Sequence, residues 1–164
     1  MLSEPKIVTK TAQPYAAIVL ELTQPEISKT APPLIADVIA WIKAQGAEHS
    51  VPPFFNYFSF SAGGRMEMQV GMPTKTVLKA DGGMATGTLP GGRYAVVTHT
   101  GPYHELHEAN MALDKWVKEQ GLTLDGTVTG DRFVGATRTE IYHMDPGEDP
   151  SGHPVTEVAF RIAD

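Results

Sequence analysis

Glu140 and Tyr142 are the side chains in this sequence best suited to binding chemistry. Residues 137–144 have the β-branched and aromatic composition of a strand, and side chains two positions apart on a strand share a face. Glu140 and Tyr142 therefore share a face with Arg138 and Met144. A tyrosine ring attracts a cation by roughly 0.5–2 kcal/mol, and a partly buried carboxylate supplies the opposite charge. The pattern favours a site for an apolar cation.

A structural interpretation of the same residues stays open. Glu140 would then be a solvated strand residue paired with Arg138 or another neighbour, and the tyrosines would belong to the core. Phe55 and Tyr57 occupy the matching positions of an earlier aromatic segment. If the two segments are related by symmetry, these aromatics face Glu140 and Tyr142. We therefore treat Glu140, Tyr142, Phe55 and Tyr57 as candidate ligand-contacting residues.

Four further residues are weaker candidates for the same site. His99 and Tyr103 flank a Gly-Pro turn between an expected strand and an expected helix. They either line a cleft there or only set the angle of the helix. Trp41 and Trp116 hold equivalent positions on two expected helices. Such residues are more often core than ligand contacts, although a cleft between helix and sheet would let them be both.

The sequence does not indicate a metal centre or a cofactor. Cys is absent, which removes disulfides, thiolate nucleophiles and Cys-based zinc sites. His104 and His107 are three positions apart, whereas the zinc-protease motif needs two His four apart with Glu after the first. The acidic loop at 145–149 lacks the alternating ligand spacing of a calcium hand. We expect no metal and no cofactor.

The elements that must position these residues occur twice. The segment WIKAQG at 41–46 returns as WVKEQG at 116–121, and the flanking segments return in the same order. Two units are too few for a solenoid, but they can form one pseudo-symmetric domain with a pocket at the seam. We expect a single domain over residues 1–164, with repeats at about 5–76 and 84–164.

Each repeat is expected to fold as strand, helix, strand, strand. Antiparallel strand pairs with helices on one face make an α+β domain. Runs of β-branched and aromatic residues indicate the strands, and a 3.6-residue apolar period indicates the helices. The predicted strands are residues 15–22, 54–60, 65–70, 93–100, 137–144 and 155–162, and the two predicted helices are residues 30–45 and 105–120.

Composition places the chain among ordinary globular proteins, with 41% apolar and 20% charged residues. The net charge of −6 and the lack of a basic stretch argue against nucleic-acid binding, which needs clustered Lys and Arg to neutralise phosphates. No signal peptide is visible, nor an apolar run of the roughly 18–20 residues that a membrane helix needs. We expect a cytoplasmic protein that contacts neither membrane nor nucleic acid directly.

The order of motifs resembles a known family. PGGRYAVVTHTGPY at 90–103, WVKEQG at 116–121, EIY at 140–142 and TEV at 156–158 are similar to the signature of GyrI-like small-molecule-binding proteins. The resemblance covers nearly the whole chain and is strongest from Leu89 onward. The family includes the effector-binding domains of AraC- and MerR-type multidrug regulators, and stand-alone proteins such as the gyrase inhibitor.

The resemblance implies a tandem βαββ fold, related to the haem-binding SOUL proteins, whose central cleft binds lipophilic, often cationic compounds between aromatics and an acid. The family's acid falls at Glu140. Two other functions stay open: hydrolysis of reactive cyclopropane-type compounds with Glu140 as general acid or base, and gyrase-inhibitor-like binding of an unidentified protein partner. The relation to SOUL proteins also leaves a tetrapyrrole ligand open. In contrast to the full regulators, we expect no helix-turn-helix before the first repeat.

The charge of the chain predicts that the isolated protein does not bind duplex DNA at physiological salt, because no cluster of cations is available to displace counterions from the phosphates. Fluorescence anisotropy with a labelled random duplex tests this expectation. Micromolar binding that weakens as salt is added would contradict it.

Overall fold

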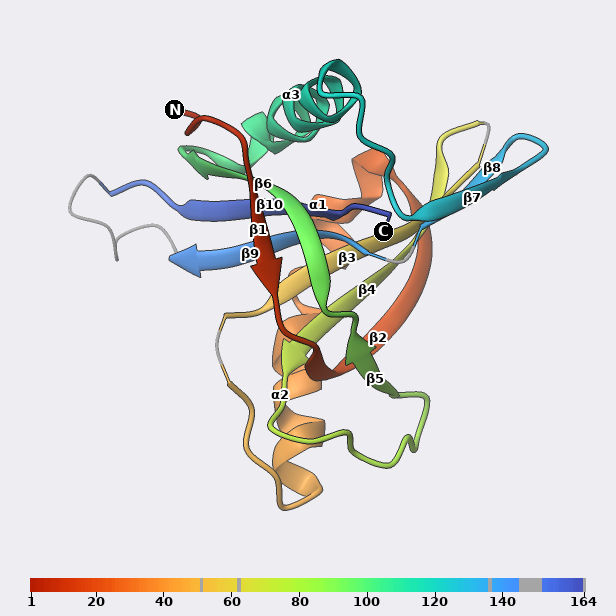
Figure 1. Cartoon of the computed structure of the whole chain (residues 1–164). Helices are drawn as coiled ribbons and strands as arrows, with labels where there is room; N and C mark the ends of the chain where they lie inside the picture. The colour runs from red at the N-terminus through yellow and green to blue at the C-terminus, as the bar shows by residue number, and fades with distance from the viewer. Residues whose placement is uncertain (51, 62, 136, 145–151, 164) are drawn as a thin grey trace.

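A curled antiparallel sheet carries helices in this protein (Figure 1). The computed structural model describes all residues except 51, 62, 136, 145–151 and 164. The strands are β1 (Lys6–Lys10), β2 (Gln13–Thr23), β3 (Phe54–Phe60), β4 (Arg65–Pro73), β5 (Ala85–Leu89), β6 (Gly92–Thr100), β7 (Gly126–Thr129), β8 (Arg132–Gly135), β9 (Arg138–Met144) and β10 (Val155–Arg161). The α-helices are α1 (Ile27–Thr30), α2 (Leu34–Ala44) and α3 (Leu106–Glu119), with 3₁₀ turns η1 (Gln24–Glu26) and η2 (Tyr103–Glu105).

The strand order shows the two predicted repeats. It runs β1-β6-β10-β9-β3-β4-β2-β5, so β2, α2, β3 and β4 form one half and β6, α3, β9 and β10 the other. The inner strands β3 and β9 pair with each other at the centre, with Phe55 opposite Glu140. The predicted α+β class and tandem βαββ arrangement are confirmed.

Strands β1 and β5 were not predicted. Strand β1 precedes the first half in the sequence but pairs with β6 of the second half, and β5 precedes the second half but pairs with β2 of the first. Lys10 lies opposite Gly92 at the end of the β1–β6 pair. Three residues on, Gln13 lies opposite Leu89 in the β2–β5 pair, so the register continues without a shift. The edge strands β1 and β5 lie at opposite ends of the strand order, and short connections join β1 to β2 and β5 to β6. These connections bring the two ends of the sheet together, so the sheet is curled. Both strands have only five residues, too few for a clear apolar alternation.

The helices correct one part of the prediction. A single helix over 30–45 is expected, but the structure contains α1, a break, and then α2. Pro32 and Pro33 lie in the break because neither has an N–H to continue the hydrogen bonds of α1. The domain therefore has three α-helices in the described part of the chain, where two are predicted. No helix in that part is long and apolar enough to cross a membrane.

The repeated WxKxQG motif is a helix stop that occurs in both halves. The backbone N–H of Gln45 donates to the carbonyl of Trp41 at 3.1 Å, and Gln120 donates to Trp116 at 3.0 Å. Gly46 and Gly121 follow with φ of 73° and 69°, a left-handed conformation that glycine adopts without steric cost. The two halves thus end their helices in the same way.

Apolar clusters beneath the helices make up much of the core. One cluster joins β6, β10 and α3 around Leu113, Val117 and Phe160. A second lies around Phe55, Met68 and neighbours in the first half. Tyr142 packs against both clusters, so its ring sits at the seam between the halves.

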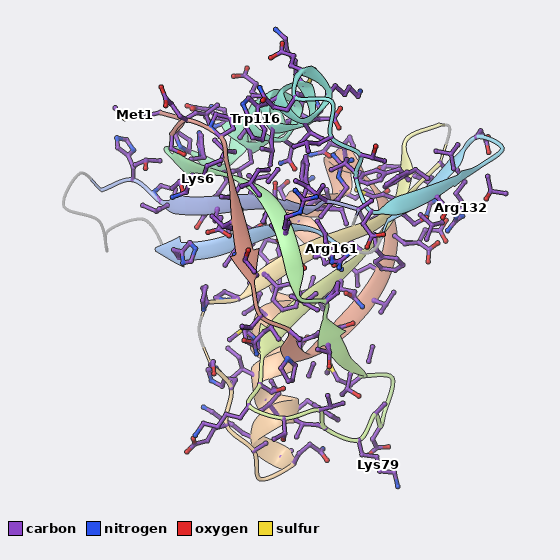
Figure 2. The ribbon with its side chains drawn as sticks, in the orientation of Figure 1. Met1, Lys6, Lys79, Trp116, Arg132 and Arg161 are labelled. Carbon is purple, nitrogen blue, oxygen red and sulfur yellow. The ribbon has the colours of Figure 1, made fainter. Side chains whose placement is uncertain are left out.

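A β7–β8 hairpin that was not predicted extends the second half. Strand β8 pairs with β3 at Ser59 and Phe60, and Arg132 of β8 forms an ion pair with Glu67 of β4. Figure 2 shows Arg132 on this hairpin, at the side of the sheet. All four residues of β7 are exposed, which explains why no amphipathic pattern marks the hairpin in the sequence.

Glu157 on β10 contacts side chains of two other strands, β1 and β9, and makes the free energy of unfolding depend on pH. Lys10 Nζ of β1 donates to its Oε1 at 2.5 Å, and His143 Nε2 of β9 lies 3.7 Å from its Oε2. Burial acts to raise the pKa of Glu157, but the hydrogen bonds of His143 and Lys10 outweigh it and lower the pKa to about 2.

The lowered pKa of Glu157 predicts acid sensitivity. Its contribution to the free energy of unfolding is fully present above the unfolded pKa of about 4.3 and is lost as pH falls toward 2, a change of up to about 3 kcal/mol. Urea unfolding of wild type and Glu157→Gln between pH 2.5 and 7 measures it. The difference in stability between the two proteins should shrink as pH falls; a constant difference would contradict the assignment.

Candidate ligand-binding site

A cavity of about 810 Å³ lies between the two helix-bearing halves of the protein. Its volume falls within the roughly 300–1,000 Å³ typical of small-molecule pockets. Residues of β3 and β9 line it together with residues of α3 and of the segment from η1 to α2. Much of its wall is apolar, and the apolar side chains are Pro25, Ile27, Pro32, Ile35, Pro53, Phe55, Phe60, Met66, Leu106 and Met111.

The carboxylate of Glu140 is the polar centre of this cavity. Its Oε1 accepts hydrogen bonds from the hydroxyls of Tyr57 at 2.8 Å and Tyr142 at 2.7 Å. Its Oε2 accepts one from Nδ2 of Asn110 at 2.9 Å. Glu140 is only 7% exposed, and no ion pair forms with it among the described residues. The interpretation of Glu140 as a solvated residue paired with Arg138 is therefore wrong: the carboxylate is buried and held by three neutral donors.

The two phenols stay protonated beside this carboxylate. Burial, followed by the charge of Glu140 and the hydrogen bond to it, raises the pKa of Tyr57 well above its usual value. Burial, followed by the charges of Glu140 and Tyr57, does the same to the pKa of Tyr142. Both hydroxyls therefore remain donors at neutral pH and solvate the carboxylate as fixed dipoles.

Strand register and helix position explain how the three donors converge. Because Phe55 lies opposite Glu140 in the β3–β9 pair, their side chains share a face. Tyr57 lies two residues beyond Phe55 on that face, and Tyr142 two residues beyond Glu140. Asn110 reaches the carboxylate from α3, where its Nδ2 also donates to the Leu106 carbonyl at 2.8 Å.

Aromatic rings surround the acidic centre. The rings of Phe55 and Tyr142 are 4.9 Å apart with an interplanar angle of 76°. Tyr103 on η2 lies 5.8 Å from Tyr142 at 84°. These are edge-to-face contacts, the arrangement that aromatic quadrupoles favour. Tyr103 is 42% exposed and so borders the cavity on its solvent side.

Five of the eight residues named from the sequence line the cavity: Glu140, Tyr142, Phe55, Tyr57 and Tyr103. Strand alternation and the matched position in the two repeats were sufficient to group the first four. Tyr103 joins them because η2 begins directly after the Gly-Pro turn.

The other three, His99, Trp41 and Trp116, do not line the cavity. His99 is buried on β6, with its Nε2 3.1 Å from Oε2 of Glu105. Trp41 and Trp116 are partly buried and pack against the core of their own halves. Both tryptophans lie in the last turn of their helices, whereas Leu106 and Asn110 line the cavity from the first turns of α3.

Sequence reasoning missed Asn110 as a site residue. The signal was present, because Asn110 is a polar residue beside the apolar positions Leu106, Ala109 and Leu113 of α3. His104 and His107 also line the cavity. Among the described residues, no group of three His, Cys, Asp or Glu side chains is arranged to hold a metal ion.

Solved structures share this fold at low sequence identity. The C-terminal domain of EcmrR is 19% identical, with a TM-score of 0.76 and coverage of 98% of both chains. In the EcmrR–DNA complex the match covers 98% of this chain but 57% of the longer EcmrR chain. SAV2435 bound to tetraphenylphosphonium is 13% identical, with a TM-score of 0.66 and coverage of 98% of this chain and 94% of that one. A hydrolase from Listeria innocua is 13% identical, with a TM-score of 0.58 and coverage of 98% of this chain and 92% of that one.

The curled sheet and its cavity form an α+β domain with a pocket of ligand size. No curated protein matches the chain in sequence. The family model of the GyrI-like small molecule binding domain matches residues 3–163, and the chain belongs to this family. The resemblance seen in the sequence motifs is thereby confirmed.

The raised pKa values of Tyr57 and Tyr142 predict a loss of stability at alkaline pH. Unfolding exposes phenols that ionise near pH 10, whereas the folded protein keeps them neutral, so stability is complete below about pH 10 and falls above it by up to about 1.4 kcal/mol per pH unit and phenol. Urea unfolding between pH 8 and 11 should show a smaller alkaline loss for Tyr57→Phe and Tyr142→Phe. Phenolate absorbance from both residues near pH 10 in the folded protein would contradict this.

Proposed function

We propose that the cavity binds lipophilic cations and that Glu140 provides the counter-charge. The observation that carries this proposal is a buried carboxylate with three neutral donors and no ion-pair partner among the described residues. Buried charges are ordinarily paired. A cationic ligand would complete the pair that the protein leaves open.

The energetics of the cavity favour such a ligand. A carboxylate–cation contact is stronger at low effective dielectric than at the surface. The cost of burying Glu140 is already met in part by its three hydrogen bonds, and an incoming cation offsets more of it. The rings of Phe55, Tyr142 and Tyr103 offer faces for stacking and cation–π contact.

Structural neighbours support the same ligand class. SAV2435 was solved with tetraphenylphosphonium, a cation enclosed by four phenyl rings. EcmrR, whose C-terminal domain has this fold, was solved on DNA. We infer for this chain a sensing or sequestering role, in which ligand binding in the cavity is the primary event.

Substitution of Glu140 by Gln tests the counter-charge directly, because Gln keeps the size and removes the charge. We expect tetramethylrhodamine methyl ester, a lipophilic cation, to bind about 10- to 100-fold more weakly to Glu140→Gln than to wild type. Nile red, a neutral lipophilic dye, should change little because the aromatic walls remain. Fluorescence titration supplies both affinities.

Glu67→Gln is the matched control, since Glu67 is a carboxylate on β4 that pairs with Arg132 and does not line the cavity. It should bind both dyes as wild type does. Equal binding of the cationic dye to Glu140→Gln and to wild type would remove Glu140 from the site.

Recovery of the bound compounds separates binding from turnover. Hydrolysis through Glu140 is the competing function, and one similar structure is that of a hydrolase. In this protein the carboxylate already accepts three hydrogen bonds, which suits a fixed charge better than a proton acceptor. Mass spectrometry should therefore recover the ester unchanged; an altered product that is absent with Glu140→Gln would favour the enzyme.

A further inference from the structure

Arg138 places a second charge in the wall of the cavity. It lies on β9 two residues before Glu140 and lines the same cavity. Two residues of strand correspond to about 7 Å. The cavity therefore contains a carboxylate and a guanidinium on one strand face, near enough for one small molecule to reach both.

The guanidinium of Arg138 lies over two phenylalanine rings and has no hydrogen-bond partner among the described residues. Its central carbon lies 4.1 Å from the ring centroid of Phe160 and 5.1 Å from that of Phe60. Among the described residues, none accepts a hydrogen bond from it or forms an ion pair with it. Burial lowers the pKa of Arg138 from its ordinary value, although a guanidinium stays charged in proteins.

Asp114 is the acidic group that acts on Arg138 through space, and its charge opposes that lowering of the pKa. It lines the cavity from α3, but its Oδ2 lies 3.0 Å from Nζ of Lys118. The nearby carboxylate thus has its contact with another cation. The donors of Arg138 remain available to whatever occupies the cavity.

We propose that Arg138 is a specificity-determining residue that binds an anionic oxygen group of the ligand, so that the preferred ligand carries a cation for Glu140 and a carboxylate-type group for Arg138. This inference rests on the proposed function and narrows its ligand class from cations to amphoteric, aromatic compounds. A guanidinium is planar and presents its N–H groups along its edge, where a carboxylate binds with two hydrogen bonds.

A pair of dyes that differ in one group tests the proposal on the wild-type protein. Tetramethylrhodamine has the same cationic ring system as its methyl ester, but its carboxylate is free. We expect the free acid to bind at least about fivefold more tightly than the ester, as measured by equilibrium dialysis at pH 7.5. Equal binding, or tighter binding of the ester, would overturn the proposal.

Variants then assign the preference to Arg138. Arg138→Met keeps an unbranched side chain against the rings and should weaken the free acid about tenfold while the ester changes less than about twofold. Arg138→Lys keeps the charge without the planar fork and should retain part of the preference for the acid. Arg132→Met, a control on the β8 hairpin outside the cavity, should bind both dyes as wild type does.

The same measurements separate failure of this inference from failure of the proposed function. Glu140→Gln should weaken both dyes alike, because both carry the same cation, whereas Arg138→Met should weaken the acid alone. If wild type binds both dyes equally and Arg138→Met changes neither, the inference fails and the cation site stands. If wild type binds neither dye, both are rejected. Should Arg138→Met not fold, the wild-type preference and Arg138→Lys decide.

Discussion

The buried carboxylate of Glu140 is the constraint on which the architecture depends. A carboxylate that is 7% exposed and has no ion-pair partner among the described residues is costly unless donors replace the lost water. Those donors come from three separate places: Tyr57 from the first repeat, Tyr142 from the second, and Asn110 from α3. The charge is tolerated only where the halves and the helix are correctly assembled, so the polar centre of the cavity and the fold require each other.

The topology of the sheet supplies that assembly. The two halves meet through their inner strands, β3 and β9, which are neighbours at the centre of the sheet. At the outer ends, β1 and β5 each pair with a strand of the opposite half. A slip of one residue in the β3–β9 register would turn every side chain to the other face. Glu140 would then face away from Tyr57 and Asn110. The crossed outer strands, tied further by Lys10 and Glu157, help fix the relation of the halves that this register needs.

Local patterns in the sequence were enough to predict the repeats, the helix stops and the face shared by Glu140 and Tyr142, because each is set by neighbours along the chain. Strands β1 and β5 are defined by their partners in the other half, and β7 is exposed on all its residues, so none carries a period of its own. Trp41 and Trp116 do not line the cavity because it extends along the first turns of each helix and ends before the last turn. That limit is set by tertiary packing and is not visible in the sequence. That Arg138 has no ion-pair partner in the described part of the chain is likewise a tertiary property, because the nearby Asp114 pairs with Lys118.

The cavity also shows why divergence of the two copies matters. Phe55 and Glu140 face each other across the central strand pair at matching positions of the repeats. An acid at both positions would place two buried carboxylates opposite each other, and like charges at such distances cannot both ionise readily. An aromatic ring opposite the acid removes that conflict and adds a surface for stacking. Tyr57 and Tyr142, also at matching positions, both carry a hydroxyl and donate to the same oxygen. The two halves thus each supply one donor to the same oxygen, and the difference between them at one position leaves a single charge between the donors.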